Sequence, residues 1–185
     1  MKRNSRLRDI FQEPPLAAFK RDVNLNDMLV HSKHNKIFST TIKGTQVCAQ
    51  NCTICKYFKV GNSVISKGRE FRFNDCISWK TSNLVYGIFC EECKEIVYVG
   101  ETGVTLYERF QNHISSIRNN KNEPIPNHFN GPHHELKDLK IVGIEKIRKN
   151  DIFLRKIKET FWIKKLQTLI PVGLNQNEGL GEKMY

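Results

Sequence analysis

Two short runs of β-branched and aromatic residues constrain the fold more than any other feature of this sequence. They occupy residues 84–89 (LVYGIF) and 96–99 (IVYV), and only six residues separate them, a pattern that predicts two strands joined in a hairpin. The predicted tip carries Cys-Glu-Glu-Cys, residues 90–93. Because side chains alternate along a strand and pairing aligns neighbours, Tyr86 and Tyr98 can face the same side. Two aromatic residues that only pack together are the ordinary interpretation.

Further elements are predicted after the hairpin. Residues 105–118 carry apolar side chains at the spacing of one helical face. These side chains are Leu106, Phe110, Ile114 and Ile117. A third strand is predicted over residues 139–147, and a last helix from Asp151, a capping residue, to about Leu169, because Pro171 limits its extent. We therefore expect an α+β fold, in which a small central antiparallel three-stranded β-sheet is flanked by helices.

The chain before the hairpin divides into two segments. Residues 1–36 are basic, contain two prolines and only short apolar patches, and are interpreted as an appendage. Residues 37–82 combine glycines, short β-prone runs and four of the six cysteines. A segment so poor in apolar residues would gain stability from a metal, so we expect a Cys-rich, zinc-stabilised linker before a domain at residues 83–178.

Charge and composition narrow the class of protein. The 185 residues carry a formal net charge of +11, which favours a polyanionic partner such as nucleic acid, although an acidic protein or a solvated basic surface also fits. The sequence has no long apolar run, so no membrane span is predicted. No secretory peptide is expected at residues 1–20, so the cysteines are expected to be reduced. Paired cysteines in a reducing compartment indicate metal ligands.

A first zinc site is predicted from a long polar connection. Residues 119–134 show no periodic pattern, and a structureless connection of that length is uncommon unless something fixes it. Together with the Cys-x2-Cys at the hairpin tip, its histidines would complete a tetrahedral sulfur and nitrogen set for Zn²⁺. The predicted ligands are Cys90, Cys93, His128 and His134. His133 is a rival to His134.

A second zinc site in the linker is left open. Four thiolates could bind the ion, from Cys48, Cys52, Cys55 and Cys76. Cys76 lies far along the chain from the others, and His31 or His34 could replace it. Buried cysteines without a partner are the alternative interpretation.

Three polar residues of the two predicted helices are candidates for chemistry. Arg109 and His113 are four residues apart and therefore neighbours on one helical face. Glu159 is the only acidic residue of the last helix after Asp151, and it lies among lysines and an arginine. Its carboxylate could hold a hard cation such as Mg²⁺. A helical ion pair is the ordinary interpretation of such a residue.

The order of these residues resembles the GIY-YIG nuclease family over about half of the chain. The resemblance rests on Leu84-Val85-Tyr86, Tyr98-Val99-Gly100-Glu101-Thr102, Arg109, His113, Glu159 and Gly173-Leu174-Asn175. The first motif departs from the family in having Leu-Val where Gly-Ile is usual, and Val99 stands where isoleucine is usual. Both tyrosines are kept, and the family resemblance implies the GIY-YIG nuclease fold.

Within that family the sequence is similar to the nucleases of Penelope-like retroelements. Those nucleases resemble it in carrying Cys-x2-Cys between the tyrosine motifs and a His-Phe-Asn stretch that ends in another histidine, here residues 128–134. Residues 48–55 resemble the linker before the nuclease in these elements, and residues 14–33 resemble the end of their reverse transcriptase. The polymerase body is missing, which leaves open whether the chain is a fragment, a truncated copy or a nuclease retained by a host.

The resemblance implies phosphodiester hydrolysis with one Mg²⁺ or Mn²⁺ ion held by Glu159. Arg109 would offer positive charge to the developing phosphorane. Tyr86 and Tyr98 would position and help deprotonate the attacking water, with the metal and Arg109 lowering a phenol pKa, and which tyrosine is the base stays open. His113 would orient the phosphate or relay a proton. Asn175 would form hydrogen bonds within the site.

The same resemblance implies a biological setting. The chain would nick or cleave DNA to prime retroelement insertion in the nucleus, with DNA and the element RNA as partners. A catalytically inactive, zinc-stabilised DNA-binding module is the alternative, since it would share every feature except turnover.

Overall fold

A computed structural model of the chain describes residues 43–47, 54–148, 150–177 and 179. All of them fall within one compact unit of the chain, Thr40–Tyr185. The predicted appendage at residues 1–36 lies outside the described residues. So do four of the candidate ligands of the second zinc site, His31, His34, Cys48 and Cys52.

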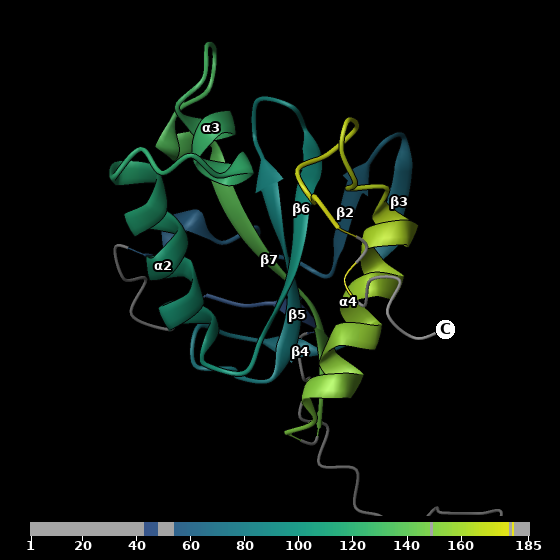
Figure 1. Ribbon diagram of the computed structural model, residues 1–185. Coiled ribbons are helices and arrows are strands. Elements are labelled where there is room, and N and C mark those ends of the chain that lie inside the picture. The colour runs from purple at the N-terminus through teal and green to yellow at the C-terminus, as the bar shows by residue number, and fades with distance from the viewer. Residues whose placement is uncertain (1–42, 48–53, 149, 178, 180–185) are drawn as a thin grey trace, which may run out of the picture. The chain divides into compact units, whose positions relative to one another are not determined.

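A three-stranded antiparallel sheet forms the centre of the described structure (Figure 1). Its strands are β5 (Leu84–Cys90), β6 (Glu95–Thr102) and β7 (Leu139–Lys146), in the order β6-β5-β7. The predicted hairpin joins β5 to β6, and the predicted third strand pairs with the other edge of β5. The expected small antiparallel three-stranded sheet is therefore confirmed. Every residue of the central strand β5 is buried.

The two long helices begin where their sequences predict. α2 (Leu106–Arg118) is capped by Thr105, whose hydroxyl accepts a hydrogen bond from the Glu108 N–H, while the Glu108 carboxylate accepts one from the Thr105 N–H. α4 (Ile152–Leu166) follows Asp151, whose carboxylate accepts a hydrogen bond from the first turn. The buried residues of α2 are Leu106, Phe110, His113, Ile114 and Ile117. The predicted apolar face is thus confirmed, with His113 added to it.

The predicted end of the last helix is wrong by one turn. α4 ends at Leu166 because Gln167 adopts a left-handed conformation, with φ of 54°. Leu169, which was expected to close the helix, instead forms a bridge with Asn175. The chain after α4 is therefore folded back on itself, and this arrangement depends on contacts that helical periodicity does not report.

The predicted structureless connection at residues 119–134 is also wrong. It contains a short helix, α3 (Pro124–Phe129), and a 3-10 turn, η3 (Leu136–Asp138), follows it. Proline suits the first turn of a helix because its φ is already helical and its missing N–H has no partner there. Ile125 and Phe129, four residues apart, are buried in the same cluster as α2. Pro124 and Pro126 flank Ile125, and prolines at these positions argued against a helix when only the spacing of apolar residues was considered.

Helices cover both faces of the sheet, with α2 and α3 on one side and α4 on the other (Figure 1). Alternate residues of β5 enter two hydrophobic clusters. Tyr86 and Ile88 pack in the cluster that contains Phe110 of α2. Val85 packs in the cluster that contains Trp162 of α4. None of the described helices has the length and apolar character needed to cross a bilayer.

The described part of the Cys-rich linker packs against both faces of this domain. Its elements are β1 (Gly44–Thr45), η2 (Cys55–Tyr57), β2 (Ser63–Ser66), β3 (Arg69–Arg72) and β4 (Cys76–Ile77). Phe58 stacks on Trp79 with ring centroids 3.9 Å apart, in the cluster under α2. Phe73 contacts Trp162 edge to face in the cluster under α4. The linker therefore contributes apolar side chains to both cores.

Candidate functional site

Tyr86, Arg109 and His113 form a hydrogen-bonded group between the sheet and α2. The Tyr86 hydroxyl accepts a hydrogen bond from Arg109 Nε at 2.8 Å and lies 2.8 Å from His113 Nε2. The guanidinium can only donate, so the phenol proton is free to be donated to His113 Nε2 in the tautomer that leaves this nitrogen unprotonated. The one-turn spacing on α2 places both partners against the same phenol.

Tyr98 lies beside this group on the same face of the hairpin. Register pairs Tyr98 with Ile88, and Tyr86 with Gly100, so the two tyrosines are diagonal neighbours. A Cβ atom at Gly100 would lie 2.6 Å from the Tyr86 hydroxyl oxygen and 2.8 Å from the Tyr98 ring. Glycine at this position is what allows the two phenols to approach each other. The predicted shared face of the tyrosines is found in the structure.

Burial controls the ionisation of both phenols. It raises the pKa of Tyr86 and of Tyr98 above the ordinary value near 10. Arg109 acts in the opposite direction on both groups, but its effect is smaller than that of desolvation. Arg109 therefore lowers both phenol pKa values in the expected direction, but desolvation outweighs it, because the same packing that brings Arg109 close also removes water. The further lowering expected from a bound metal stays a prediction.

His113 is held neutral by its surroundings. Burial, reinforced by the charge of Arg109, lowers its pKa from 6.5 to about 3. A neutral imidazole fits its role as acceptor of the Tyr86 proton. His113 was expected to orient the phosphate or to relay a proton. In either role it would act as a neutral imidazole.

The pH dependence of stability should report this buried histidine. As pH falls below 6.5 the unfolded chain protonates His113 while the folded protein does not, so the stability present above pH 6.5 is progressively lost towards pH 3. Between pH 7 and pH 5 the free energy of unfolding should fall by about 2 kcal/mol from this group. In His113→Gln, the free energy of unfolding measured with urea should not show this fall between pH 7 and pH 5. An identical pH profile in both proteins would contradict the assignment.

Glu159 faces the same region from the other side, in the middle of α4. Its Oε1 accepts a hydrogen bond from the Glu101 N–H of β6 at 3.2 Å. Burial raises the pKa of Glu159 to about 7, and the charge of Glu101 adds to the rise, while Arg109 and Lys156 oppose it. Glu159 is therefore a half-buried carboxylate at the wall of a cavity.

A partly buried ion pair fixes α4 against the end of β6. Arg155 Nε donates to Glu101 Oε2 at 2.7 Å, and Arg155 Nη1 donates to Asn83 Oδ1 at 2.8 Å. Glu101, the acceptor in this ion pair, is also the residue whose backbone N–H binds Glu159. Sequence reasoning counted Arg155 only as a basic neighbour of Glu159. Two features of the sequence could have indicated this ion pair. Arg155 lies one helical turn before Glu159, and the second tyrosine motif contains an acid, Glu101.

Asn175 binds the backbone of β6. Its Oδ1 accepts a hydrogen bond from the Val99 N–H at 2.9 Å, and its Nδ2 donates to the Val99 carbonyl at 2.8 Å. The side chain is buried, and it ties the segment after α4 to the strand position next to Tyr98. The expected hydrogen bonding of Asn175 within the site therefore takes the form of a contact that positions the backbone.

A cavity of about 340 Å³ joins these side chains. The predicted residues that line it are Tyr98, Arg109, His113, Glu159 and Asn175. Its size falls in the ordinary range of small-ligand sites. The half-buried carboxylate can bind a hard cation. The guanidinium and the phenol can donate hydrogen bonds to a phosphate in the same open space.

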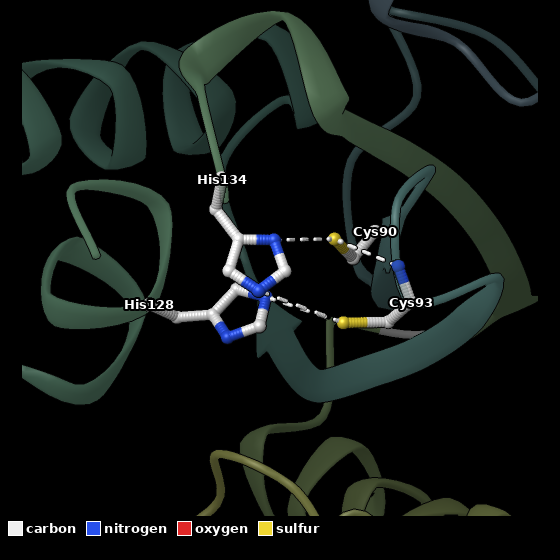
Figure 2. A group of neighbouring side chains, drawn as sticks. All are labelled: Cys90, Cys93, His128 and His134. Carbon is white, nitrogen blue, oxygen red and sulfur yellow. Dashed lines mark hydrogen bonds between the residues drawn. The ribbon is translucent and has the colours of Figure 1, made fainter. Parts of the chain in front are cut away.

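Four sulfur and nitrogen donors gather at the hairpin tip, away from this cavity lining (Figure 2). They belong to Cys90, Cys93, His128 and His134, and their ligand atoms all lie within 4.8 Å of one another. Cys90 Sγ is 3.6 Å from His134 Nδ1, and Cys93 Sγ is 3.8 Å from His128 Nε2. Tetrahedral zinc would separate such atoms by roughly 3.3–3.8 Å, given its bond lengths. The donor set fits Zn²⁺.

The remaining candidate ligands are placed as follows. His133 is exposed, has a φ of 67° and does not belong to this four-residue group, so the structure brings His134 to it instead. Cys55 is buried in the cluster under α2, and Cys76 is exposed on β4. Because Cys48 and Cys52 lie outside the described residues, the second zinc site stays a prediction.

Comparison with known proteins gives one match. Residues 82–175 match the family model of the GIY-YIG catalytic domain, a span that covers just over half of the 185 residues. The span runs from the start of the hairpin to Asn175 and includes both the cavity residues named above and the four-residue Cys/His group. No curated protein and no solved structure matches the chain.

Proposed function

This chain belongs to the GIY-YIG catalytic domain family, a family of nucleases, and from that membership we propose a divalent-metal-dependent endonuclease that nicks or cleaves DNA by phosphodiester hydrolysis. One observation carries the proposal. Side chains from β6, α2 and α4, far apart in sequence, line a single cavity, with Tyr98, Arg109 and Glu159 on its wall. A purely structural role does not require a guanidinium and a carboxylate to face shared open space.

Glu159 is the residue that would hold Mg²⁺ or Mn²⁺. Such ions take one or two carboxylates and complete their coordination with water and substrate phosphate, which the half-buried Glu159 at an open cavity permits. When bound, the ion would polarise a phosphoryl oxygen and offset charge on the leaving oxygen. The Arg155–Glu101 pair would act as a positioning contact, since it fixes the turn of α4 that carries this carboxylate.

The protein side chains divide the remaining work. Arg109 lines the cavity and places fixed positive charge where a phosphate would lie. Tyr98 also lines it, so its phenol would orient the attacking water, whereas Tyr86 is fully buried behind Arg109 and would hold the guanidinium in place. His113 would keep the Tyr86 proton directed away from Arg109. In this proposal Tyr98 is the tyrosine that contacts the reacting groups.

Plasmid cleavage tests the proposal directly. With Mg²⁺ or Mn²⁺ the protein should convert supercoiled plasmid to nicked circles or linear DNA, and EDTA should stop the reaction, because the phosphoryl charge would lose its counter-ion. The alternative, an inactive DNA-binding module, predicts salt-dependent retention of plasmid without any conversion. Retention without nicking in both metals would favour that alternative and sink the enzymatic proposal.

We further propose a structural zinc ion at Cys90, Cys93, His128 and His134. The ion would join the hairpin tip to α3 and to the chain before β7. A second zinc, at Cys48, Cys52, Cys55 and Cys76, is proposed for the linker. Only Cys55 and Cys76 of that set are described.

The setting is proposed from sequence alone. The Cys-x2-Cys and His-Phe-Asn pattern supports the Penelope-like subgroup, and residues 14–33 support an adjoining reverse transcriptase. The nuclease would then prime retroelement insertion in the nucleus, acting on DNA with the element RNA as a further partner. The basic net charge of +11 is compatible with both nucleic acids.

A further inference from the structure

A second hollow adjoins the candidate active-site cavity, between α3 and the chain that follows α4. The two share a wall made by Glu123, Pro124, Leu174 and Gln176. The hollow therefore lies next to the place where the scissile phosphate is proposed to bind. A nucleotide that neighbours a phosphate held at Arg109 would be within reach of this hollow.

The lining of this hollow is rich in amides. We call it the amide pocket and define it by Asn122, Asn127, Gln176, Pro124, Ile170 and Leu174. Glu123 and His128 complete its lining. Asn127 Nδ2 donates to Asn122 Oδ1 at 3.0 Å, which orients these two amides and directs the Asn127 carbonyl oxygen and the Asn122 amino group to other partners. Amides that offer both donors and acceptors can pair with the edge of a nucleobase.

Charge argues against a phosphate in the amide pocket. Among its described lining residues there is no lysine or arginine, and Glu123 contributes a carboxylate. This is unusual in a chain with 30 basic residues and a net charge of +11. Arg109, the cation of the adjoining cavity, is absent from the lining of the amide pocket. A flat, neutral group with polar edges satisfies these walls better than the sugar-phosphate backbone.

We infer that the amide pocket receives an unpaired nucleobase of the cleaved strand, next to the scissile phosphate. The inference rests on the proposed DNA-cleaving function and deepens it. The apolar side chains of Pro124, Ile170 and Leu174 would contact the faces of the base, and the amides its edge. A base stacked within a duplex cannot enter such a hollow. The preferred substrate therefore has an unpaired nucleotide at this position, or a base pair there that opens at low cost.

Oligonucleotides with one altered nucleotide test this preference. The cleaved phosphate is mapped first. For each nucleotide position beside it, three substrates are then made, in which that nucleotide is base-paired, bulged or abasic. At one flanking position the bulged nucleotide should raise kcat/KM about tenfold or more over the paired one, because unpairing has already occurred. The abasic substitution at that position should remove most of the gain, since the base itself is bound.

A double variant links the preference to the pocket. Asn122→Ala with Asn127→Ala removes two exposed amides that line the amide pocket but not the active-site cavity, and it should lower kcat/KM for the bulged substrate about tenfold while leaving the abasic substrate unchanged. Asn74→Ala, an exposed amide elsewhere on the domain, should change neither. Equal losses on bulged and abasic substrates, or no difference among the three substrates, would overturn the inference.

Binding measurements test the amide-pocket inference independently of the proposed nuclease activity. The same oligonucleotides, titrated by fluorescence anisotropy in Ca²⁺, should show tighter binding of the bulged than of the abasic substrate, and the double variant should erase that difference. A protein that retains this pattern but cuts nothing would refute the nuclease proposal and keep the pocket. A protein that cuts but shows no base dependence would refute the pocket alone.

Discussion

Glu159→Gln should abolish DNA nicking, with a loss of at least about 10³-fold in rate. Glutamine keeps the shape and the acceptor for the Glu101 N–H but removes the charge that would hold the divalent ion. Loss of several kcal/mol of transition-state stabilisation corresponds to a change of this size. Conversion of supercoiled plasmid in Mg²⁺, followed over time for both proteins, provides the measurement.

The fold should survive this substitution. Burial raises the pKa of Glu159 to about 7, so the folded protein disfavours the ionised carboxylate and gains nothing from keeping it charged. Urea unfolding at pH 8 should therefore show no loss of stability in Glu159→Gln. Glu70→Gln, an exposed carboxylate on β3, is the matched control and should nick at the normal rate. Normal nicking by Glu159→Gln would exclude Glu159 as the metal-binding residue.

Cys93→Ala should lose the hairpin-tip zinc and lower the thermal unfolding midpoint by roughly 10 °C, since a structural zinc ion is worth several kcal/mol. Cys93 is exposed, so its replacement removes a ligand without opening a cavity in the core. Zinc content by mass spectrometry of the native protein and the midpoint with and without chelator give the readout. The chelator should destabilise the wild type more than it destabilises the variant, because the hairpin-tip ion is already missing from the variant.

Cys76→Ala serves as the control for this experiment, because Cys76 is also exposed but lies on β4, outside the described Cys/His group. It should retain the hairpin-tip zinc and its effect on the midpoint. If the linker binds a second ion, Cys76→Ala should lose only that one, so the zinc content of the two variants also counts the sites. Full zinc content in Cys93→Ala would refute the hairpin-tip assignment.

Local patterns predicted the elements whose burial follows a simple period. The run of residues 84–89 became the fully buried β5, and the four apolar residues on one face of residues 105–118 became the buried face of α2. Asp151 capped α4 because its carboxylate accepts a backbone hydrogen bond that few other side chains can accept. In these places local propensity and tertiary packing agree.

Elements fixed by distant contacts were not predictable. α3 is only six residues long, too short to show a period, and it exists because Ile125 and Phe129 pack in the cluster under α2. α4 ends early because the chain returns so that Leu169 can pair with Asn175. Strand pairing also shifts by one residue between Ile88 and Phe89, and no pattern in the sequence indicated this bulge.

The candidate site was predictable as a set of residues but not as an electrostatic arrangement. Spacing placed Tyr86 with Tyr98, and Arg109 with His113, on shared faces. Glu159 was a candidate because it is the only acid of the last helix after Asp151, and the resemblance favoured its role as a metal ligand. The raised pKa of both phenols and the lowered pKa of His113 arise from desolvation in the assembled fold, which a sequence does not contain.

Anomalous diffraction from a crystal of the protein with Mn²⁺ and a DNA oligonucleotide tests the central claim most directly. We predict an anomalous peak within about 2.5 Å of a Glu159 carboxylate oxygen, with a phosphate of the DNA between that peak and the Arg109 guanidinium. A manganese ion bound elsewhere, with no phosphate in the cavity lined by Tyr98, Arg109 and Glu159, would contradict it.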